Sequence, residues 1–207
     1  TYRSAILLAS SCWPTCRNPA NTIRIGDGYL PFGTVGSAPY ASDFDHGRRP
    51  GNLEDYRGFL KLAQRFNCID FVSGYPVEPI DVHASIRHLV ALKDMATLTD
   101  KPFHAYSLGP ERIRDGIEIA RIARGVPRAQ FETEPSLFTI INTNSPLKMD
   151  LPMLQGIMEM SAAGQIVCVT PFTLAGAMAP VTVAGALVQQ NAEALFHAAT
   201  IAQLSRD

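Results

Sequence analysis

Aromatic side chains recur in the segments that follow the apolar stretches of this sequence: Tyr40, Phe44, Tyr75, Phe103, Tyr106 and Phe172. The face of an aromatic ring attracts cations, so rings that converge on one site can hold a quaternary or tertiary ammonium, at roughly 0.5–2 kcal/mol per ring. For Phe103 and Phe172, packing inside the fold is the alternative interpretation. The pattern indicates a site for a cationic nitrogen.

Four carboxylates lie in the same segments: Asp43, Asp45, Glu78 and Asp81. Prolines flank Glu78 in the stretch "GYPVEPID", and a carboxylate held in place in this way could neutralise a cationic substrate or act as a base. For Asp81 the alternative is a helix N-cap, since a helical pattern begins near Val82. For Asp43 and Asp45 the alternative is a solvated, charged loop.

A third group of polar side chains consists of His104, Ser107, Asn142 and Asn144. His104 and Tyr106 are two residues apart on an expected strand, so their side chains share one face, as do the two asparagines. His104 could donate a hydrogen bond or a proton near neutral pH, and a purely structural histidine is the alternative. Polar pairs near the end of a buried strand need partners, and a substrate is one candidate.

Five apolar stretches alternate with helical patterns, and these elements must position the groups above. The expected strands cover 29–35, 68–74, 102–109, 136–146 and 165–172. The expected helices cover 53–66, 83–99, 110–125, 150–164 and 180–204. A Gly-Asp-Gly sequence at 26–28 predicts a hairpin that leads into the first strand. Apolar strands that alternate with helices indicate a parallel sheet covered on both faces.

Two α/β architectures fit this pattern, a doubly wound sheet and part of a (β/α)8 barrel. A doubly wound sheet concentrates its site at one switch point and usually has a Gly-rich first turn, but "GTVGSAPY" lacks that motif. Polar or aromatic loops follow all five strands here, as at the carboxyl end of a barrel. We therefore predict a (β/α)8 TIM barrel with about five βα units over residues 1–207, in which 1–28 form an amino-terminal segment and hairpin leading into the barrel.

A complete barrel needs about 250 residues, so about three βα units are missing from this sequence. An open barrel would expose strand edges. We expect the native protein to continue past Asp207, or a second chain to close the sheet, and we expect a homo-oligomer. The first residue is Thr1 and the apolar run after it is short, which indicates an internal start or a fragment and not a signal peptide.

The composition limits the class of partner. The formal net charge is -1, with 46% hydrophobic and 18% charged residues, which argues against nucleic acid as the main partner. No apolar run is long enough for a membrane span. Cys12 and Cys16 lack a second pair, so we expect no zinc site. Cys68 and Cys168 lie in apolar runs and are predicted to be buried, a usage that fits a reducing cytoplasm.

Several long blocks resemble the trimethylamine methyltransferase (MttB-like) family, among them "GYPVEPIDV", "LFTIINTNSPLKMDLPMLQGIMEMSAAGQ" and "VTPFTLAGAMAPVTVAGALVQQNAEAL". The resemblance begins near Arg17 and implies that the protein is a (β/α)8 barrel enzyme. It also implies a role in one-carbon metabolism, of which methanogenesis is one form. Such an enzyme moves a methyl group from a tertiary or quaternary amine, such as trimethylamine or glycine betaine, to the Co(I) of a corrinoid protein. The cobalamin belongs to that partner protein, so we expect no tightly bound cofactor here.

The resemblance and the groups above together give a predicted substrate-binding set, with no catalytic residue assigned. The aromatic and acidic residues near position 43 would contact the ammonium, while His104, Gln155 and the two asparagines would hold a carboxylate tail. The set comprises Tyr40, Asp43, Phe44, Asp45, Tyr75, Glu78, His104, Tyr106, Asn142, Asn144, Gln155 and Phe172. The small residues of "PFTLAGAMAP" would leave room for a corrin or a partner surface, with close loop packing as the alternative.

Two other functions fit the same residues. One is a non-catalytic protein that binds quaternary amines on the same barrel scaffold. The other is a different barrel enzyme, such as a lyase that uses Glu78 and His104.

Overall fold

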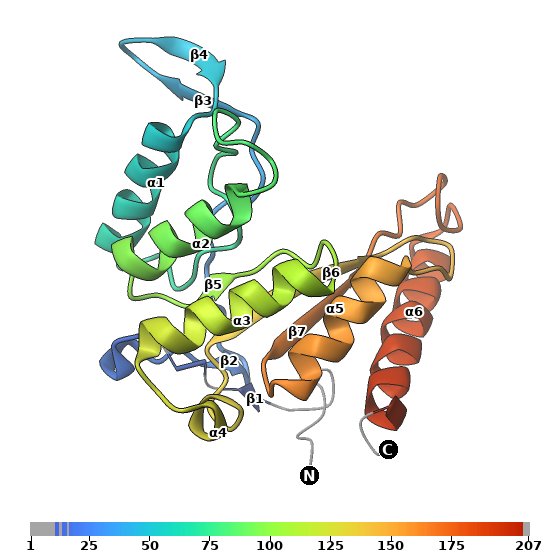
Figure 1. Cartoon of the computed structure of the whole chain (residues 1–207). Coiled ribbons are helices and arrows are strands. Elements are labelled where there is room, and N and C mark those ends of the chain that lie inside the picture. The colour runs from blue at the N-terminus through green and yellow to red at the C-terminus, as the bar shows by residue number, and fades with distance from the viewer. Residues whose placement is uncertain (1–10, 13, 16, 205–207) are drawn as a thin grey trace.

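The protein is a mixed α/β structure in which helices cover a parallel sheet, as Figure 1 shows for the computed structural model. The structure describes residues 11–12, 14–15 and 17–204. The regular part of the sheet contains β5 (Phe103–His104), β6 (Leu137–Thr143) and β7 (Ile166–Pro171), side by side in chain order and parallel. The predicted parallel arrangement of these strands is confirmed.

Two further segments extend this sheet on the β5 side. A parallel bridge pairs Val72 with Phe103, and another pairs Gly33 with Phe71. Backbone hydrogen bonds support both, with Val72 N donating to Pro102 O at 2.9 Å and Thr34 N donating to Phe71 O at 3.2 Å. Five parallel segments therefore follow one another in space in the order of the chain. The first two make only single bridges, whereas complete strands were predicted there.

A helix follows each of these five segments, as predicted. The helices are α1 (Leu53–Arg65), α2 (Arg87–Leu98), α3 (Pro110–Arg124), α5 (Leu151–Ala162) and α6 (Val183–Leu204). Helix α3 begins at Pro110, as predicted, and Gly125 ends it with a φ of 65°, a left-handed conformation that suits glycine. The Asp150 carboxylate caps α5 by accepting the Met153 N–H at 2.8 Å. None of the helices in the described part of the chain is long and apolar enough to cross a membrane.

Several short elements lie outside the predicted pattern. The segment 40–50, which was expected to be a loop, forms an antiparallel hairpin of β3 (Tyr40–Asp43) and β4 (Gly47–Pro50) that projects from the top of the molecule (Figure 1). The predicted Gly-Asp-Gly turn is confirmed, because Gly26 bridges Tyr29. The remaining short elements are β1 (Ser11–Cys12), β2 (Ile25–Gly26), which pairs with β1, the 3-10 helix η1 (Pro19–Asn21) and α4 (Arg128–Phe131).

Side chains alternate between two faces of the sheet, and one face forms the core with the helices. Ala105 and Leu137 face α3, where Gly116 makes room for them: a Cβ on Gly116 would lie 2.8 Å from the Ala105 Cβ. The buried residues Ile141, Val167 and Val169 continue this layer. Because the side-chain period of a strand is two, the neighbours of these residues must point to the opposite, inner face.

The predicted burial of Cys68 and Cys168 was wrong, and so was the alternative interpretation of Asp81 as a cap of the second helix. Asp81 does not cap the second helix, because α2 begins only at Arg87; instead Asp81 accepts the Leu53 N–H at 2.8 Å, at the start of α1. Cys168 is exposed because its neighbours Val167 and Val169 take the core side of β7, which turns the thiol to the inner face. Cys68 is exposed because it lies in the turn after α1.

The close approach of α5 to the end of β5 yields a stability prediction. A Cβ on Gly156 of α5 would overlap the buried Ser107 side chain, 2.7 Å from its Cβ. Although alanine favours a helix, we expect Gly156→Ala to lower the free energy of unfolding by about 1–3 kcal/mol, because over-packing outweighs propensity. Exposed Gly58 on α1 has no atom within 4 Å of its virtual Cβ and provides the control.

In urea titrations, Gly58→Ala should raise the free energy of unfolding by about 0.5–1 kcal/mol. If both alanine variants are stabilised to the same extent, the close contact between Gly156 and Ser107 does not exist.

Candidate functional site

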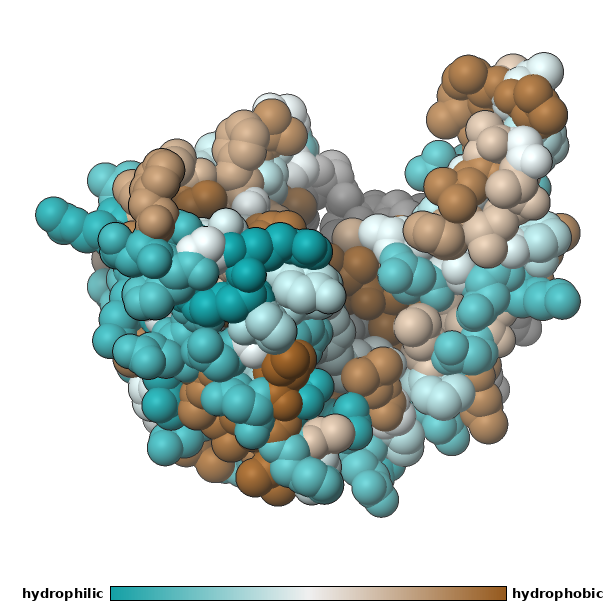
Figure 2. Space-filling view, turned by 90° about the horizontal axis from the view of Figure 1, so that it is seen from above, coloured by the Kyte–Doolittle hydropathy of each residue, from teal (hydrophilic) through white to brown (hydrophobic). Residues whose placement is uncertain are grey.

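The inner face of the sheet is lined by aromatic rings that contact one another. Seen from above, the molecule is hollowed between its left-hand body and the arm on the right (Figure 2). On this face the His104 ring stacks on Phe138 with centroids 5.5 Å apart, and Phe71 meets Phe138 edge-on at 5.2 Å. We call this surface the inner face and define it by Phe71, His104, Tyr106, Phe138, Asn142 and Thr170.

His104 is a buried histidine whose hydrogen bonding fixes its tautomer. Its Nε2 accepts the backbone N–H of Ile140 at 3.0 Å, so the neutral ring carries its proton on Nδ1. Nδ1 is buried and has no hydrogen-bond partner among the described residues. Burial lowers the pKa of His104 to about 4, which keeps the ring neutral at physiological pH. The inner face therefore contains an uncharged N–H donor that the described part of the fold leaves unpaired.

Tyr106 packs against His104, and Tyr75 packs against Tyr106. The Tyr106 ring lies 4.5 Å from that of His104 and 4.6 Å from that of Tyr75. The Tyr106 hydroxyl accepts the Tyr75 N–H at 3.1 Å and is hydrogen-bonded to Ser37 Oγ. Gly74, with a φ of 104°, permits this contact, because a Cβ there would lie 2.9 Å from the Tyr106 ring. Burial raises the pKa of both phenols, so the cluster is uncharged.

The hairpin residues form a separate group. The Arg48 guanidinium lies over the Tyr40 ring, 3.9 Å from its centroid, so one cation already occupies that ring face. Two contacts lower the pKa of the Asp43 carboxyl to about 2. The larger effect comes from the hydrogen bond with the His46 backbone N–H, and the next from the Arg49 guanidinium at 2.6 Å. Within the described residues, no hydrogen bond, ion pair or ring contact joins this group to the tyrosine and histidine cluster.

The tip of the hairpin has its own local order. The Asp43 carboxylate also accepts the Asp45 N–H at 3.0 Å, which fixes the turn, and the Phe44 side chain at the tip is fully exposed. The predicted roles of Tyr40, Asp43, Phe44 and Asp45 in binding an ammonium stay predictions.

The other predicted residues lie along the carboxyl ends of the strands. Asn142 is on the inner face and accepts a hydrogen bond from the Thr170 hydroxyl at 2.5 Å. The Asn144 side chain turns back onto its own loop and accepts the Asp150 N–H at 3.2 Å. Glu78 is half-buried, and burial raises its pKa while Arg87, 3.9 Å away, lowers it. Gln155 is half-buried on α5, and Phe172 is half-exposed after β7.

The structure therefore brings together three of the predicted residues, Tyr75, His104 and Tyr106, through direct ring contacts. It places Asn142 on the same face, beside β7. Sequence reasoning missed Phe71 and Phe138, whose positions depend on which residues of a strand turn inward, and Ser37, which lies in the loop before β3. It also missed Glu193, although a signal existed: Glu193 is the only charged residue among the 22 of α6.

Glu193 is a buried carboxylate at the carboxyl end of β6. It accepts hydrogen bonds from the Ser145 hydroxyl at 2.8 Å, the Leu147 N–H at 3.0 Å and the Gln189 amide at 3.0 Å. A fourth comes from the Thr143 hydroxyl. Burial raises the pKa of Glu193, but these hydrogen bonds lower it more, to about 2, so the group is charged at neutral pH.

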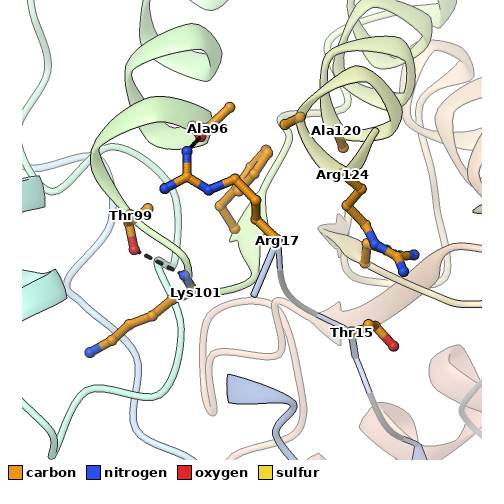
Figure 3. A pocket seen from close by; sticks show the side chains of 10 residues that line it. Thr15, Arg17, Ala96, Thr99, Lys101, Ala120 and Arg124 are labelled. Carbon is orange, nitrogen blue, oxygen red and sulfur yellow. Dashed lines mark hydrogen bonds between the residues drawn. The ribbon is translucent and has the colours of Figure 1, made fainter. Parts of the chain in front are cut away.

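A small cavity of about 10 Å³ lies at the opposite, amino end of the strands (Figure 3). Such a volume holds about one water molecule. The cations around it already have partners: Lys101 donates to the Phe66 carbonyl at 2.8 Å, Arg17 to the Ala96 carbonyl at 2.9 Å and Arg124 to Ser136 at 2.8 Å. We interpret this cavity as structural.

Residues 6–207 match the sequence profile of a family described as "Trimethylamine methyltransferase (MTTB)". The chain belongs to the trimethylamine methyltransferase family. A "Glycine betaine methyltransferase" of Desulfitobacterium hafniense (strain Y51) is 36% identical over 179 residues, which are 86% of this chain and 37% of that protein. A "Trimethylamine methyltransferase MttB" of strain DSM 10664 / DCB-2 is 28% identical over 186 residues, or 86% of this chain and 36% of that protein. The chain thus spans little more than a third of these relatives.

The buried state of His104 yields a prediction about pH. Its pKa is lower in the folded protein, about 4, than the ordinary value of 6.5, so between these values the unfolded chain binds a proton that the folded protein does not. The contribution of neutral His104 is fully present above pH 6.5 and is lost as pH falls toward 4, up to about 3 kcal/mol. We expect His104→Gln, which can still accept the Ile140 N–H, to flatten this part of the pH profile.

The measurement is the free energy of unfolding from urea titrations between pH 7.5 and 4.5 for both proteins. Parallel profiles for the wild type and His104→Gln would show that His104 does not titrate in this way.

Proposed function

We propose that the protein that contains this chain is a methyltransferase that moves a methyl group from a tertiary or quaternary amine, such as trimethylamine or glycine betaine, to the Co(I) of a cognate corrinoid protein. Membership of the trimethylamine methyltransferase family supports this function. The structural observation that carries it is the uncharged cluster in which His104 and Tyr106 of the inner face contact each other and Tyr106 contacts the buried Tyr75. Ring faces without a competing charge suit an ammonium.

We further propose that the sheet closes into a (β/α)8 barrel in the whole protein. Five parallel segments follow one another in chain order, each with a helix after it, and this is the repeating unit of such a barrel. The relatives are nearly three times as long as the matched region, which leaves room for further units. A cytoplasmic location and a homo-oligomer belong to the same proposal.

The task of this chain would be to hold the amine and expose one methyl group. A Co(I) corrin carried by the partner protein would supply the nucleophile and accept the methyl group. Tyr106, supported by the buried Tyr75, would contact the ammonium through its ring, and the Nδ1–H of His104 would donate to a carboxylate of the substrate. Holding the methyl carbon in line with the attacking cobalt would lower the activation barrier, because the entropy cost of bringing the two reactants together is met on binding.

The chemistry of the leaving group requires a nitrogen that carries a positive charge. When a quaternary ammonium loses a methyl group, the electron pair of the broken C–N bond stays on nitrogen and a neutral tertiary amine leaves, so no proton is needed. A tertiary amine takes up a proton from water at neutral pH and then leaves as a neutral secondary amine. In both cases the group that the protein holds is an ammonium, and neutral His104 adds no competing positive charge.

The loop after β7 offers a surface of small side chains for the partner. The Gly176 N–H donates to the Ala179 carbonyl at 2.9 Å and the Ala177 N–H to Leu174 at 3.1 Å, so the loop has a defined backbone. Without bulky side chains at 175–177, a flat ring system could approach closely. This supports the predicted role of "PFTLAGAMAP" in partner contact.

The direct test uses the full-length protein, a corrinoid protein reduced to Co(I), and trimethylamine or glycine betaine as methyl donor. We expect the Co(I) absorbance to disappear with one of the donors and not in a reaction without the protein. Calorimetric binding of an amine without any change at cobalt would favour a binding protein that is not an enzyme. Neither binding nor methylation would contradict the proposal.

A second test separates the inner face from the hairpin. We expect Tyr106→Leu in the full-length protein to weaken binding of the quaternary ammonium by about 2–30-fold, the cost of one ring. Tyr40→Leu should have a smaller effect, since Arg48 already covers that ring. Calorimetry gives the affinities and thermal unfolding verifies the fold. A larger loss with Tyr40→Leu would move the site to the hairpin.

A further inference from the structure

Glu193 is a charged group whose charge no described side chain neutralises. Its side chain is 1% exposed, and all four hydrogen-bond donors around it are neutral hydroxyl, amide or backbone groups. Within the described residues, no lysine or arginine forms an ion pair with it. A buried ion needs hydrogen bonds that replace its contacts with water, and Glu193 has them. These hydrogen bonds stabilise the carboxylate, but they do not cancel its charge.

The nearest titratable side chain on the same helix does not neutralise the Glu193 carboxylate. His197, one turn further along α6, is bonded through Nδ1 to the backbone carbonyl of Glu193 at 2.6 Å, and not to its carboxylate. Lys148, in the loop between β6 and α5, is exposed. The Glu193 charge therefore remains a net negative charge inside the protein.

This charge lies at the carboxyl end of the sheet. Thr143, which donates to it, is the last residue of β6 and directly follows Asn142 of the inner face. Ser145 and Leu147, which also donate to it, belong to the loop that continues from there. A buried charge is screened less than a surface charge, so its field reaches groups that it does not touch.

We propose that Glu193 is a positioning residue that also supplies the negative charge by which the site prefers an ammonium over an uncharged group of the same shape. Its hydrogen bonds hold residues 143–147 in place, next to Asn142, and its field favours a cation bound above the inner face. The inference rests on the proposed function, because it assumes an ammonium ligand. It assigns cation selection to a residue that would not contact the ligand.

The test compares ligands that differ only in charge. Glycine betaine and 3,3-dimethylbutanoate share a carboxylate and differ in the central atom, a charged nitrogen or a neutral carbon; choline and 3,3-dimethylbutanol form a second pair. Calorimetry on the full-length protein gives the ratio of the two affinities within each pair. This ratio reports the electrostatic preference and would not change with a general loosening of the fold.

Three variants separate the effect of the Glu193 charge from the effect of its hydrogen bonds to the loop. Glu193→Gln removes the charge, and Gln189→Lys, at a half-buried position that already contacts the carboxylate, keeps Glu193 and neutralises it. Ser145→Ala removes one hydrogen bond and leaves the charge in place. We expect the first two to reduce the preference for the cation by about fivefold or more, and Ser145→Ala to change it by less than about twofold.

The outcomes distinguish the two proposals. Wild-type protein that binds neither member of either pair would overturn the proposed function, and the inference with it. Wild-type protein that prefers the cation while Gln189→Lys keeps the same preference would overturn the inference alone, and Glu193 would then be a structural residue. Since Gln189→Lys retains all the loop contacts of Glu193, this result can be obtained even if Glu193→Gln does not fold.

Discussion

The strict alternation of side chains along the parallel strands is the constraint on which the rest of the structure depends. On β5 and β6 it sends Ala105, Leu137 and Ile141 into the layer beneath the helices. The residues between them, His104, Phe138 and Asn142, must then face the other way. A one-residue shift in register would exchange the two sets and would place a histidine and an asparagine against the apolar side of α3. The same packing that stabilises the fold thus fixes which side chains can meet a ligand.

Burial acts differently on the two kinds of ionisable group near the carboxyl ends of the strands. His104 has one hydrogen bond and no counter-charge, so removal from water keeps it neutral. Glu193 also has almost no exposed surface, but its four donors compensate for the lost water and keep it charged. An uncharged aromatic surface, in a sheet whose carboxyl end retains a negative charge, is electrostatically suited to a cation. Neither property follows from the residue type alone.

Much of the fold could be predicted from the sequence because helix signals and apolar runs are local. Pro110 and Gly125 mark α3, and Asp150 marks the start of α5. The hairpin at 40–50 was missed because its strands are polar and pair only with each other, so they show no apolar alternation. Asp81 has the residue type of a helix cap but accepts from a different helix, a long-range contact that no local pattern contains.

The candidate site was only partly predictable for the same reason. His104, Tyr106 and Asn142 could be assigned to one face by their spacing, and the contact with Tyr75 confirms that residues from two neighbouring strand segments meet. Tyr40 and Asp43 of the hairpin have the right chemistry for binding a cation, but Arg48 and Arg49 already contact them. Glu193 depends on donors about 50 residues away in the sequence, Thr143 and Ser145.

The way in which the β3–β4 hairpin is anchored has a consequence for how such proteins can diverge. Arg49 joins Asp43 to Asp55 of α1, Ala41 is buried in the core, and the Asp43 carboxylate caps the turn, so the hairpin is held at its base and at its own turn. Phe44 at its tip contributes nothing to this internal order. Selection can therefore vary the tip freely, and related lineages could acquire new surfaces there while the ring-lined sheet beneath stays as it is.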